Sequence, residues 1–194
     1  LDPEAASGSI MRKAADPGTA GAFVGITNDV TNFGTLTQTN MEYTSSTVVQ
    51  SNTNNVAQNT NDNEILRIEV VMTNSCDALN ATLFSLNTTG TSDPTDGITT
   101  SKIYYTGTSS TFATTTLFGS RATPNGAYII AGSATLSEGT NYFWLTYDVP
   151  VTATSTTLLD AECTAITIDG VGQSTPTAEP YAGSRTVGIT NINS

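Results

Sequence analysis

Apolar and polar residues alternate along much of this chain, and the alternation is clearest in residues 64–73, EILRIEVVMT. Arg67 and Glu69 fall between apolar residues there. A period of two is typical of a strand with one buried face and one exposed face. The sequence therefore predicts a strand at 64–73. Its predicted core residues are Leu66, Ile68, Val70 and Met72.

The most aromatic stretch is residues 139–150, GTNYFWLTYDVP, which contains the only Trp of the chain, Trp144. Both sets of alternate residues are largely apolar, which is typical of an interior strand that is covered on both faces. Pro150 ends the stretch because proline cannot donate a hydrogen bond to a sheet. We expect the sheets to assemble on this strand.

Further strand candidates recur at the spacing of a β-sandwich, with a polar loop over 51–63 and an Asp-rich turn over 88–97. In residues 158–170, LLDAECTAITIDG, the apolar positions change parity, so we expect a β-bulge near Thr164. The prediction is an all-β fold, a two-sheet immunoglobulin-like sandwich. The other candidate strands are 41–50, 81–87, 101–107, 114–118, 127–132 and 184–190.

Residues 1–40 differ from the rest and predict an N-terminal arm, which precedes a sandwich module at 41–194. Residues 1–19 are either a flexible segment or one to two helical turns. Residues 20–28, AGAFVGITN, are a strand candidate and share AG and VGITN with residues 182–191, AGSRTVGITN. The identity is either chance or a sign that both ends of the chain form the same kind of strand.

The chain has a net charge of −11 and only six basic residues. Nucleic-acid binding needs a positive surface, so this composition excludes it, and it equally disfavours anionic membrane surfaces. No apolar run is long enough for a membrane-spanning helix, so we expect no membrane insertion. The absence of His excludes His-based triads and His-ligated metals within the chain. A low charge density with abundant Thr, Ser and Asn suits a protein exported to the cell surface or the medium.

Several segments resemble one repeat family: IYYTGTSSTFATTTLFGS at 103–120, LSEGTNYFWLTYDVP at 136–150, LLDAECTAITIDG at 158–170 and AGSRTV at 182–187. The stretches MEYTSSTVVQ at 41–50 and EILRIEVVMTNSCDALNATLFSLNTTG at 64–90 are similar to its beginning. The family is the N-terminal domain associated with BNR-repeat neuraminidases, which occurs in tandem in secreted and surface proteins of Bacteroidota. The resemblance implies an exported, bacterial, non-catalytic β-sandwich module.

The resemblance does not carry neuraminidase activity to this chain. Sialidases use an arginine triad and a nucleophilic Tyr, whereas the four Arg of this chain lie in unrelated segments, at positions 12, 67, 121 and 185. We therefore expect that the chain is not an enzyme.

Three carboxylates are candidates for a site. Asp148 ends the aromatic strand, and Asp160 and Glu162 share a face of the next one. If these two strands pair, the three side chains converge and offer the oxygen ligands that calcium prefers. The alternatives are solvated strand ends or, with less support, a carboxylate pair for glycoside hydrolysis.

Aromatic and sulfur-containing side chains leave two further questions open. Trp144, Tyr142 and Tyr104 form either an aromatic platform for sugars or, as we favour, part of the sandwich core. Cys76 and Cys163 are too few for a zinc site, and they form either one disulfide or two buried free thiols.

The segment at 20–28 must cover its apolar side chains somewhere. It either folds back on its own sheet or adds to a sheet edge of another copy. The second arrangement does not close, so it builds a filament. We therefore expect a structural subunit or repeat of a surface filament or adhesin that binds copies of itself head to tail. The alternative is a carbohydrate-binding or spacer module of a larger secreted glycoside-processing protein. The candidate assembly residues are Ala22, Phe23, Val24 and Ile26.

Overall fold

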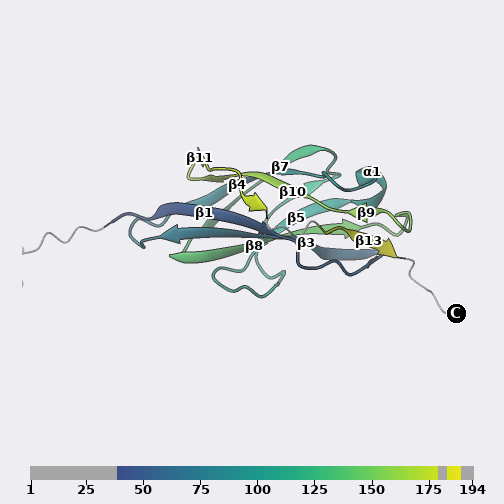
Figure 1. The fold of residues 1–194 in the computed structure, drawn as a ribbon, viewed down its shortest axis with the longest axis horizontal. Helices are drawn as coiled ribbons and strands as arrows, with labels where there is room; N and C mark the ends of the chain where they lie inside the picture. Colours follow the sequence, from purple (N-terminus) through teal and green to yellow (C-terminus); the bar gives the residue numbers. More distant parts are fainter. Residues whose placement is uncertain (1–38, 179–182, 189–194) are drawn as a thin grey trace, which may run out of the picture. The chain divides into compact units, whose positions relative to one another are not determined.

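A computed structural model of the chain describes residues 39–178 and 183–188, which form two facing sheets and one small sheet at an end (Figure 1). The large sheet contains β1 (Glu42–Val49), β3 (Thr60–Thr73), β5 (Thr100–Tyr105), β6 (Leu117–Ala122), β8 (Gly139–Val149) and β12 (Thr177–Ala178). The opposite sheet contains β4 (Asn80–Asn87), β7 (Ala127–Thr135), β10 (Glu162–Ile168) and β11 (Val171–Gly172). The end sheet contains β2 (Val56–Ala57), β9 (Leu158–Leu159) and β13 (Arg185–Gly188).

The order of strands is β12-β1-β3-β8-β5-β6 in the large sheet and β11-β10-β4-β7 in the opposite sheet. The predicted all-β, two-sheet sandwich is therefore confirmed. One short helix, α1 (Pro94–Gly97), lies within the turn predicted at 88–97. Asp93 caps this helix, because its carboxylate accepts hydrogen bonds from the backbone N–H groups of Thr95 and Asp96.

β8 occupies the interior position that its aromatic sequence predicts, between β3 and β5. One set of its alternate residues lies in the core between the sheets, with each side chain at most 2% exposed. Trp144 has the other parity, so it lies on the outer face of the large sheet. The expectation that Trp144 fills the sandwich core is therefore wrong. The core residues of β8 are Phe143, Leu145, Tyr147 and Val149.

β3 confirms the predicted alternation, because Leu66, Ile68, Val70 and Met72 are all buried in the core. The strand begins earlier than predicted, at Thr60, and β2 also lies in the segment 51–63 that we expected to be a loop. The polar side chains of this early part bond to neighbouring strands. Asn63, for example, donates to the Tyr147 carbonyl at 3.0 Å.

The β-bulge predicted near Thr164 is present in β10. Cys163 pairs with Leu86 and Ala165 pairs with the adjacent Ser85, so Thr164 is the extra residue. The bulge returns Ile166 and Ile168 to the core side, as the change in apolar parity requires.

Aromatic rings at the centre of the core join the two sheets. Phe84 of β4 packs on Phe143 of β8 at 4.8 Å and on Phe118 of β6 at 5.2 Å between ring centroids. Phe118 in turn contacts Phe143 edge to face at 5.7 Å. Two rings of the large sheet, from β6 and β8, therefore contact one ring of the opposite sheet, from β4, and these contacts fix how the two sheets face each other.

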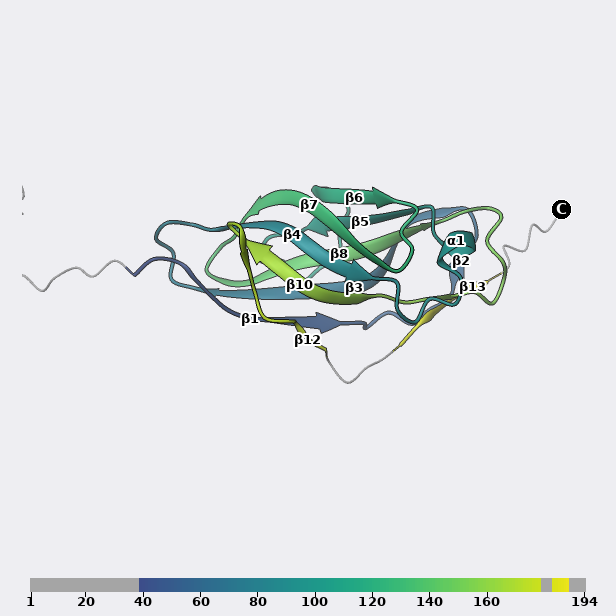
Figure 2. The same cartoon turned by 90° about the horizontal axis from the view of Figure 1, so that it is seen from above.

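β6 and β7 approach closely at one side of the sandwich, where the two sheets meet (Figure 2). Gly119 of β6 and Gly132 of β7 make this approach possible. A Cβ at Gly119 would collide with the Ala131 carbonyl oxygen, and one at Gly132 would collide with the Phe118 carbonyl oxygen. The small residues thus let two backbones pack where side chains would hold them apart.

The two ends of the module are marked by the first and last strands described. Glu42 of β1 pairs with Thr73, the last residue of β3, whereas Val187 of β13 pairs with Val56, just before β3 begins. Because β3 has 14 residues, these points lie roughly 40 Å apart at the rise of a strand. The chain thus enters this module at one end and leaves it at the other (Figure 1).

β13 is tied to the module by Arg185, which is 7% exposed. Its guanidinium donates to the Asn54 carbonyl at 2.8 Å and to the Glu64 carbonyl at 2.7 Å. Burial lowers the pKa of Arg185, and the two carbonyls supply the partners that a buried cation needs. No helix in the described part of the chain is long and apolar enough to cross a membrane.

Candidate functional site: the outer face of the large sheet and its loop

Aromatic and charged side chains meet on the outer face of β3, β8 and β5. Trp144 of β8 is paired with Arg67 of β3 on one side and with Tyr104 of β5 on the other. Residues paired directly across strands point to the same face of a sheet, so the three form a row. The Arg67 guanidinium lies 5.9 Å from the ring centroids of both Trp144 and Tyr142. The structure thus brings the three aromatic residues of the expected platform onto one face.

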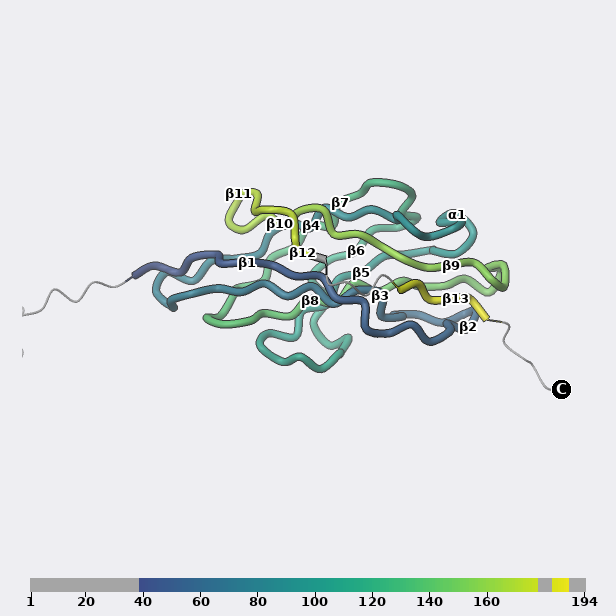
Figure 3. Tube along the Cα trace, viewed as in Figure 1, coloured from purple at the N-terminus to yellow at the C-terminus, as the bar shows by residue number. Residues whose placement is uncertain are grey.

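The platform is nevertheless covered, because Trp144 is only 3% exposed. Its indole Nε1 donates to the Thr106 hydroxyl at 2.9 Å, and the Phe112 ring packs on it at 5.4 Å. Both residues belong to the loop 106–116 between β5 and β6, which lies over β8 on its outer side (Figures 1 and 3). Trp144 therefore anchors a loop and is not free to stack on a sugar.

The loop 106–116 is also held by its backbone. The Thr106 N–H donates to the Tyr142 carbonyl at 3.1 Å, and the Tyr142 N–H donates to the Gly107 carbonyl at 2.8 Å. Gly107 has a φ of +64°, in the left-handed region that glycine adopts most easily. These bonds continue the β5–β8 pairing by two residues before the chain turns away from the sheet.

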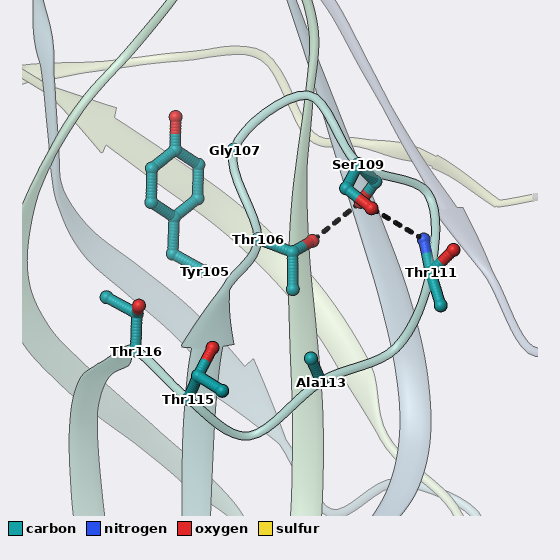
Figure 4. A pocket seen from close by; sticks show the side chains of 8 residues that line it. All are labelled: Tyr105, Thr106, Gly107, Ser109, Thr111, Ala113, Thr115 and Thr116. Atoms are coloured by element: carbon teal, nitrogen blue, oxygen red, sulfur yellow. Dashed lines mark hydrogen bonds between the residues drawn. The ribbon is translucent and has the colours of Figure 1, made fainter.

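The loop borders a shallow hollow of about 590 Å³ that is open to solvent (Figure 4). No charged side chain lines it, and five of its lining residues carry aliphatic hydroxyl groups. Inside the loop, the Thr106 hydroxyl donates to the Ser109 carbonyl at 2.7 Å, and the Ser109 hydroxyl accepts from the Thr111 N–H at 3.3 Å. The lining residues are Tyr105, Thr106, Gly107, Ser109, Thr111, Ala113, Thr115 and Thr116.

A cluster of charges lies further along the same face. The Lys102 ammonium contacts Asp148 at 2.7 Å and Asp62 at 2.9 Å. The Tyr104 hydroxyl donates to Asp62 at 2.8 Å, and the Asp62 N–H donates to Asp148 at 2.9 Å. Asp62 has a φ of +56°, so an irregular position of β3 places its carboxylate over the neighbouring strands. We call Asp62, Lys102, Tyr104 and Asp148 the ion cluster.

The ion cluster changes the titration of its members. Burial disfavours the charged forms of Asp62 and Lys102, but their hydrogen bonds outweigh it. The net result is that the pKa of Asp62 is lowered and the pKa of Lys102 is raised. Burial and the hydrogen bond to Asp62 raise the pKa of Tyr104 to about 12. Tyr104 thus remains protonated at neutral pH as a hydrogen-bond donor.

These groups offer little for hydrolysis. Tyr104 is a poor nucleophile because its pKa is raised, and both carboxylates of the cluster are held by Lys102. Among the described residues, Arg67 pairs with Glu69 at 2.7 Å and Arg185 binds backbone carbonyls in the end sheet, so no arginine cluster forms.

The condition under which the three carboxylates would converge, pairing of their two strands, is not met. Asp148 belongs to β8 in the large sheet, and Glu162 belongs to β10 in the opposite sheet, so their strands do not pair. Asp160 lies before β10, where its carboxylate accepts from the Ala161 N–H at 2.7 Å and burial raises its pKa. Within residues 39–178 and 183–188, no group of three or more acidic or sulfur ligands is placed to hold a metal.

Cys76 and Cys163 are free thiols in this structure and do not form the disulfide, and of the two only Cys163 is buried, whereas Cys76 is partly exposed. Cys76 lies just before β4, near the end where Ala81 pairs with Ile168. Cys163 lies five residues back along β10, roughly 17 Å away at the rise of a strand. A disulfide needs Cα atoms within about 7 Å of each other.

Sequence reasoning missed Lys102, Asp62 and the loop 106–116 as parts of this face. One signal was available, because Lys102 is one of only two Lys in an acidic chain and sits inside a strand. The candidate assembly residues Ala22, Phe23, Val24 and Ile26 lie outside the described residues, so that expectation stays a prediction.

The fold is that of a β-sandwich module, and a match to a family model identifies the family to which the module belongs. Residues 44–171 match the family described as the N-terminal domain of BNR-repeat neuraminidase, so the chain belongs to this family. The structure is also similar to the Hadza microbial sialidase Hz136, with a TM-score of 0.57 and 14% sequence identity. That match covers 73% of this chain and only 31% of the sialidase chain. No curated protein matches the sequence.

Proposed function

We propose that this chain is a non-catalytic accessory module of a larger, exported glycoside-processing protein, in which it separates neighbouring parts. The family match over residues 44–171 carries this proposal, because that family is described by its position N-terminal to a neuraminidase. The similarity to part of a sialidase chain is consistent with a module of a longer protein. The same association supports an exported location.

The geometry of the module supports a spacer role. The first residue of β1 and the last described strand, β13, lie at opposite ends of the fourteen-residue strand β3. A sandwich with a continuous apolar core resists bending, so segments attached at its two ends are held apart. Arg185 supports this role, because its two hydrogen bonds fix the last strand to the module.

The proposal is tested by activity and by the neighbouring coding sequence. The isolated chain is incubated with fluorogenic α-sialosides and β-galactosides, and we expect no turnover above buffer. Sequencing of the flanking coding region is expected to reveal a glycoside-processing domain in the same reading frame. Turnover that the substitution Asp62→Asn abolishes would show that the module is itself an enzyme.

The head-to-tail filament is a second hypothesis, and it rests on the shared VGITN sequence. The C-terminal copy begins in β13, where Val187 is fully buried and bonds to Thr157 through its backbone at 2.9 Å. The first two residues of this sequence, Val187 and Gly188, therefore belong to a strand, which is the observation that favours the idea for residues 24–28. Negative-stain electron microscopy of the full chain beside a chain lacking residues 1–28 tests it. Filaments in the first sample only would support assembly, and single particles in both would exclude it.

A further inference from the structure

We propose that Asn125 is a site of spontaneous deamidation and that the Thr88 hydroxyl group controls the rate of this reaction in the folded protein. Asn125 and Gly126 are the only Asn-Gly pair in the sequence. They lie in the tight connection between β6, which ends at Ala122, and β7, which begins at Ala127. The reaction concerns this turn alone and is independent of the accessory role.

Deamidation joins an asparagine side chain to the backbone nitrogen of the residue that follows it. The Gly126 nitrogen attacks the Asn125 Cγ atom, the Cγ–Nδ2 bond breaks, and ammonia leaves with the proton of the attacking nitrogen. Water then opens the resulting cyclic imide at either of its carbonyl groups, which produces an aspartyl or an isoaspartyl residue. The two residues of the turn and water are thus the complete set of reactants.

The structure leaves the reacting groups accessible. Asn125 is exposed, and its side chain makes no hydrogen bond to any residue that the structure describes. Gly126 has a φ of +69°, and a Cβ added to it would meet no atom within 4 Å. Because Gly126 has no side chain, nothing obstructs the ring closure that a bulkier residue would hinder. Water therefore reaches the turn freely, and ammonia leaves it freely.

Two hydrogen bonds to Thr88 restrain the attacking nitrogen. The Gly126 N–H donates to the Thr88 Oγ1 atom at 3.0 Å, and the Gly126 carbonyl accepts from the Thr88 N–H at 3.1 Å. Thr88 directly follows β4 and is only 4% exposed, so the bond to its hydroxyl group is shielded from water. The nitrogen must lose its proton and turn toward the Asn125 Cγ atom, and a neutral hydroxyl group is too weak a base to take that proton. The folded protein therefore reacts mainly after the bond to Thr88 opens.

Conversion of Asn125 would change the turn in two ways. Either product adds a carboxylate to a chain whose net charge is already −11. The isoaspartyl product also inserts an extra backbone atom before Gly126, which moves Gly126 away from its two bonding groups on Thr88. Asn87 and Ala127 are the last residues paired between β4 and β7, and the bonds of Thr88 to Gly126 continue that pairing. Deamidation would therefore loosen this end of the opposite sheet.

The test follows the complete 194-residue chain over weeks at neutral pH and body temperature, with aspartyl and isoaspartyl products quantified at each Asn by peptide mapping. We expect conversion to be fastest at Asn125, and slower in the folded protein than in guanidinium chloride. Thr88→Val keeps the shape of the side chain but removes the acceptor. It should speed conversion in the folded protein about fivefold, since one hydrogen bond is worth about 1 kcal/mol. Thr88→Ser retains the hydroxyl group and should react at the wild-type rate.

Two control variants separate the effect of Thr88 from a general loss of stability. Asn125→Gln should abolish conversion at this turn, because the longer side chain closes a ring far less readily. Gly132→Ala strains the contact between β6 and β7 without touching Thr88, so it should accelerate conversion less than Thr88→Val does. Three results would overturn the inference: conversion at Asn125 that is absent or slower than at another Asn of the unfolded chain, equal rates in wild type and Thr88→Val, or an equal acceleration in Gly132→Ala.

Discussion

The two outer faces of the sandwich differ in charge and in cover. The outer face of the large sheet carries the ion cluster and Arg67, and the loop 106–116 lies over its Trp144. The strands of the opposite sheet contain a single charged residue, Glu162, and Ile129 on their outer face is 52% exposed. The comparison teaches that a loop forms a third layer over the large sheet, whereas no segment among the described residues covers Ile129 of the opposite sheet.

The largest expected effect is on the covered face. Trp144→Ala removes the ring that holds Thr106 and Phe112, so we expect a loss of about 3–5 kcal/mol in the free energy of unfolding. Ile129→Ala on the bare face should change it by less than about 0.5 kcal/mol. Urea unfolding followed by circular dichroism measures both, since the first variant lacks the only Trp. Similar losses in the two variants would mean that the loop adds no stability to its face.

The next effect concerns the side where the two sheets meet. Gly132→Ala places a Cβ against the Phe118 carbonyl oxygen, so the backbones of β6 and β7 must move apart. We expect a cost of about 1–3 kcal/mol in the free energy of unfolding, as for other overpacked sites. Gly172→Ala is the matched control, because an added Cβ there meets no atom within 4 Å. Equal stability of the two variants in thermal unfolding would contradict the close approach.

A smaller effect is expected from the ion cluster. Lys102→Met leaves Asp62 and Asp148 facing each other without a cation, and the side chain of Asp148 is only 11% exposed. Because Lys102 itself is partly exposed, we expect a loss of only about 1 kcal/mol. Arg121→Met, which removes an exposed cation with no ion pair among the described residues, should cost nearly nothing. Chemical unfolding at neutral pH compares the two variants.

The same cluster predicts a dependence on pH at both extremes. The pKa of Asp62 is lowered on folding, so its contribution to stability is present above its ordinary pKa of 3.8 and is lost as the pH falls further. The pKa of Tyr104 is raised from 10.0 to about 12, so its contribution is complete below pH 10 and is lost between these values. Melting temperatures across the pH range should fall less steeply below pH 4 in Asp62→Asn and above pH 10 in Tyr104→Phe. Parallel profiles for wild type and variants would show that these groups are not linked to folding.

The pattern of apolar residues was enough to predict the sheets and that β8 is covered on both faces, but not which segment covers its outer face. The core residues of β3 and β8 and the bulge at Thr164 follow from apolar parity, which responds directly to burial. Trp144 was assigned to the core because one large aromatic residue on a central strand usually fills a sandwich, and here a loop distant in sequence buries it on the outer face. The ion cluster joins Asp62 to Lys102 and Asp148 across three strands. Such pairing depends on strand order, which a single sequence does not contain.

The smallest effect separates the two thiols without changing stability. Cys163 lies on the inner side of the opposite sheet at 3% exposure, and burial raises its pKa to about 12, whereas Cys76 lies partly exposed in the connection before β4. The thiolate is the reactive form, so Cys163 should stay unreactive in the native protein. Ellman's reagent should therefore label one thiol in buffer and two in guanidinium chloride. Rapid labelling of both in buffer would mean that the opposite sheet opens easily, and labelling of neither in guanidinium chloride would mean that the cysteines are bonded.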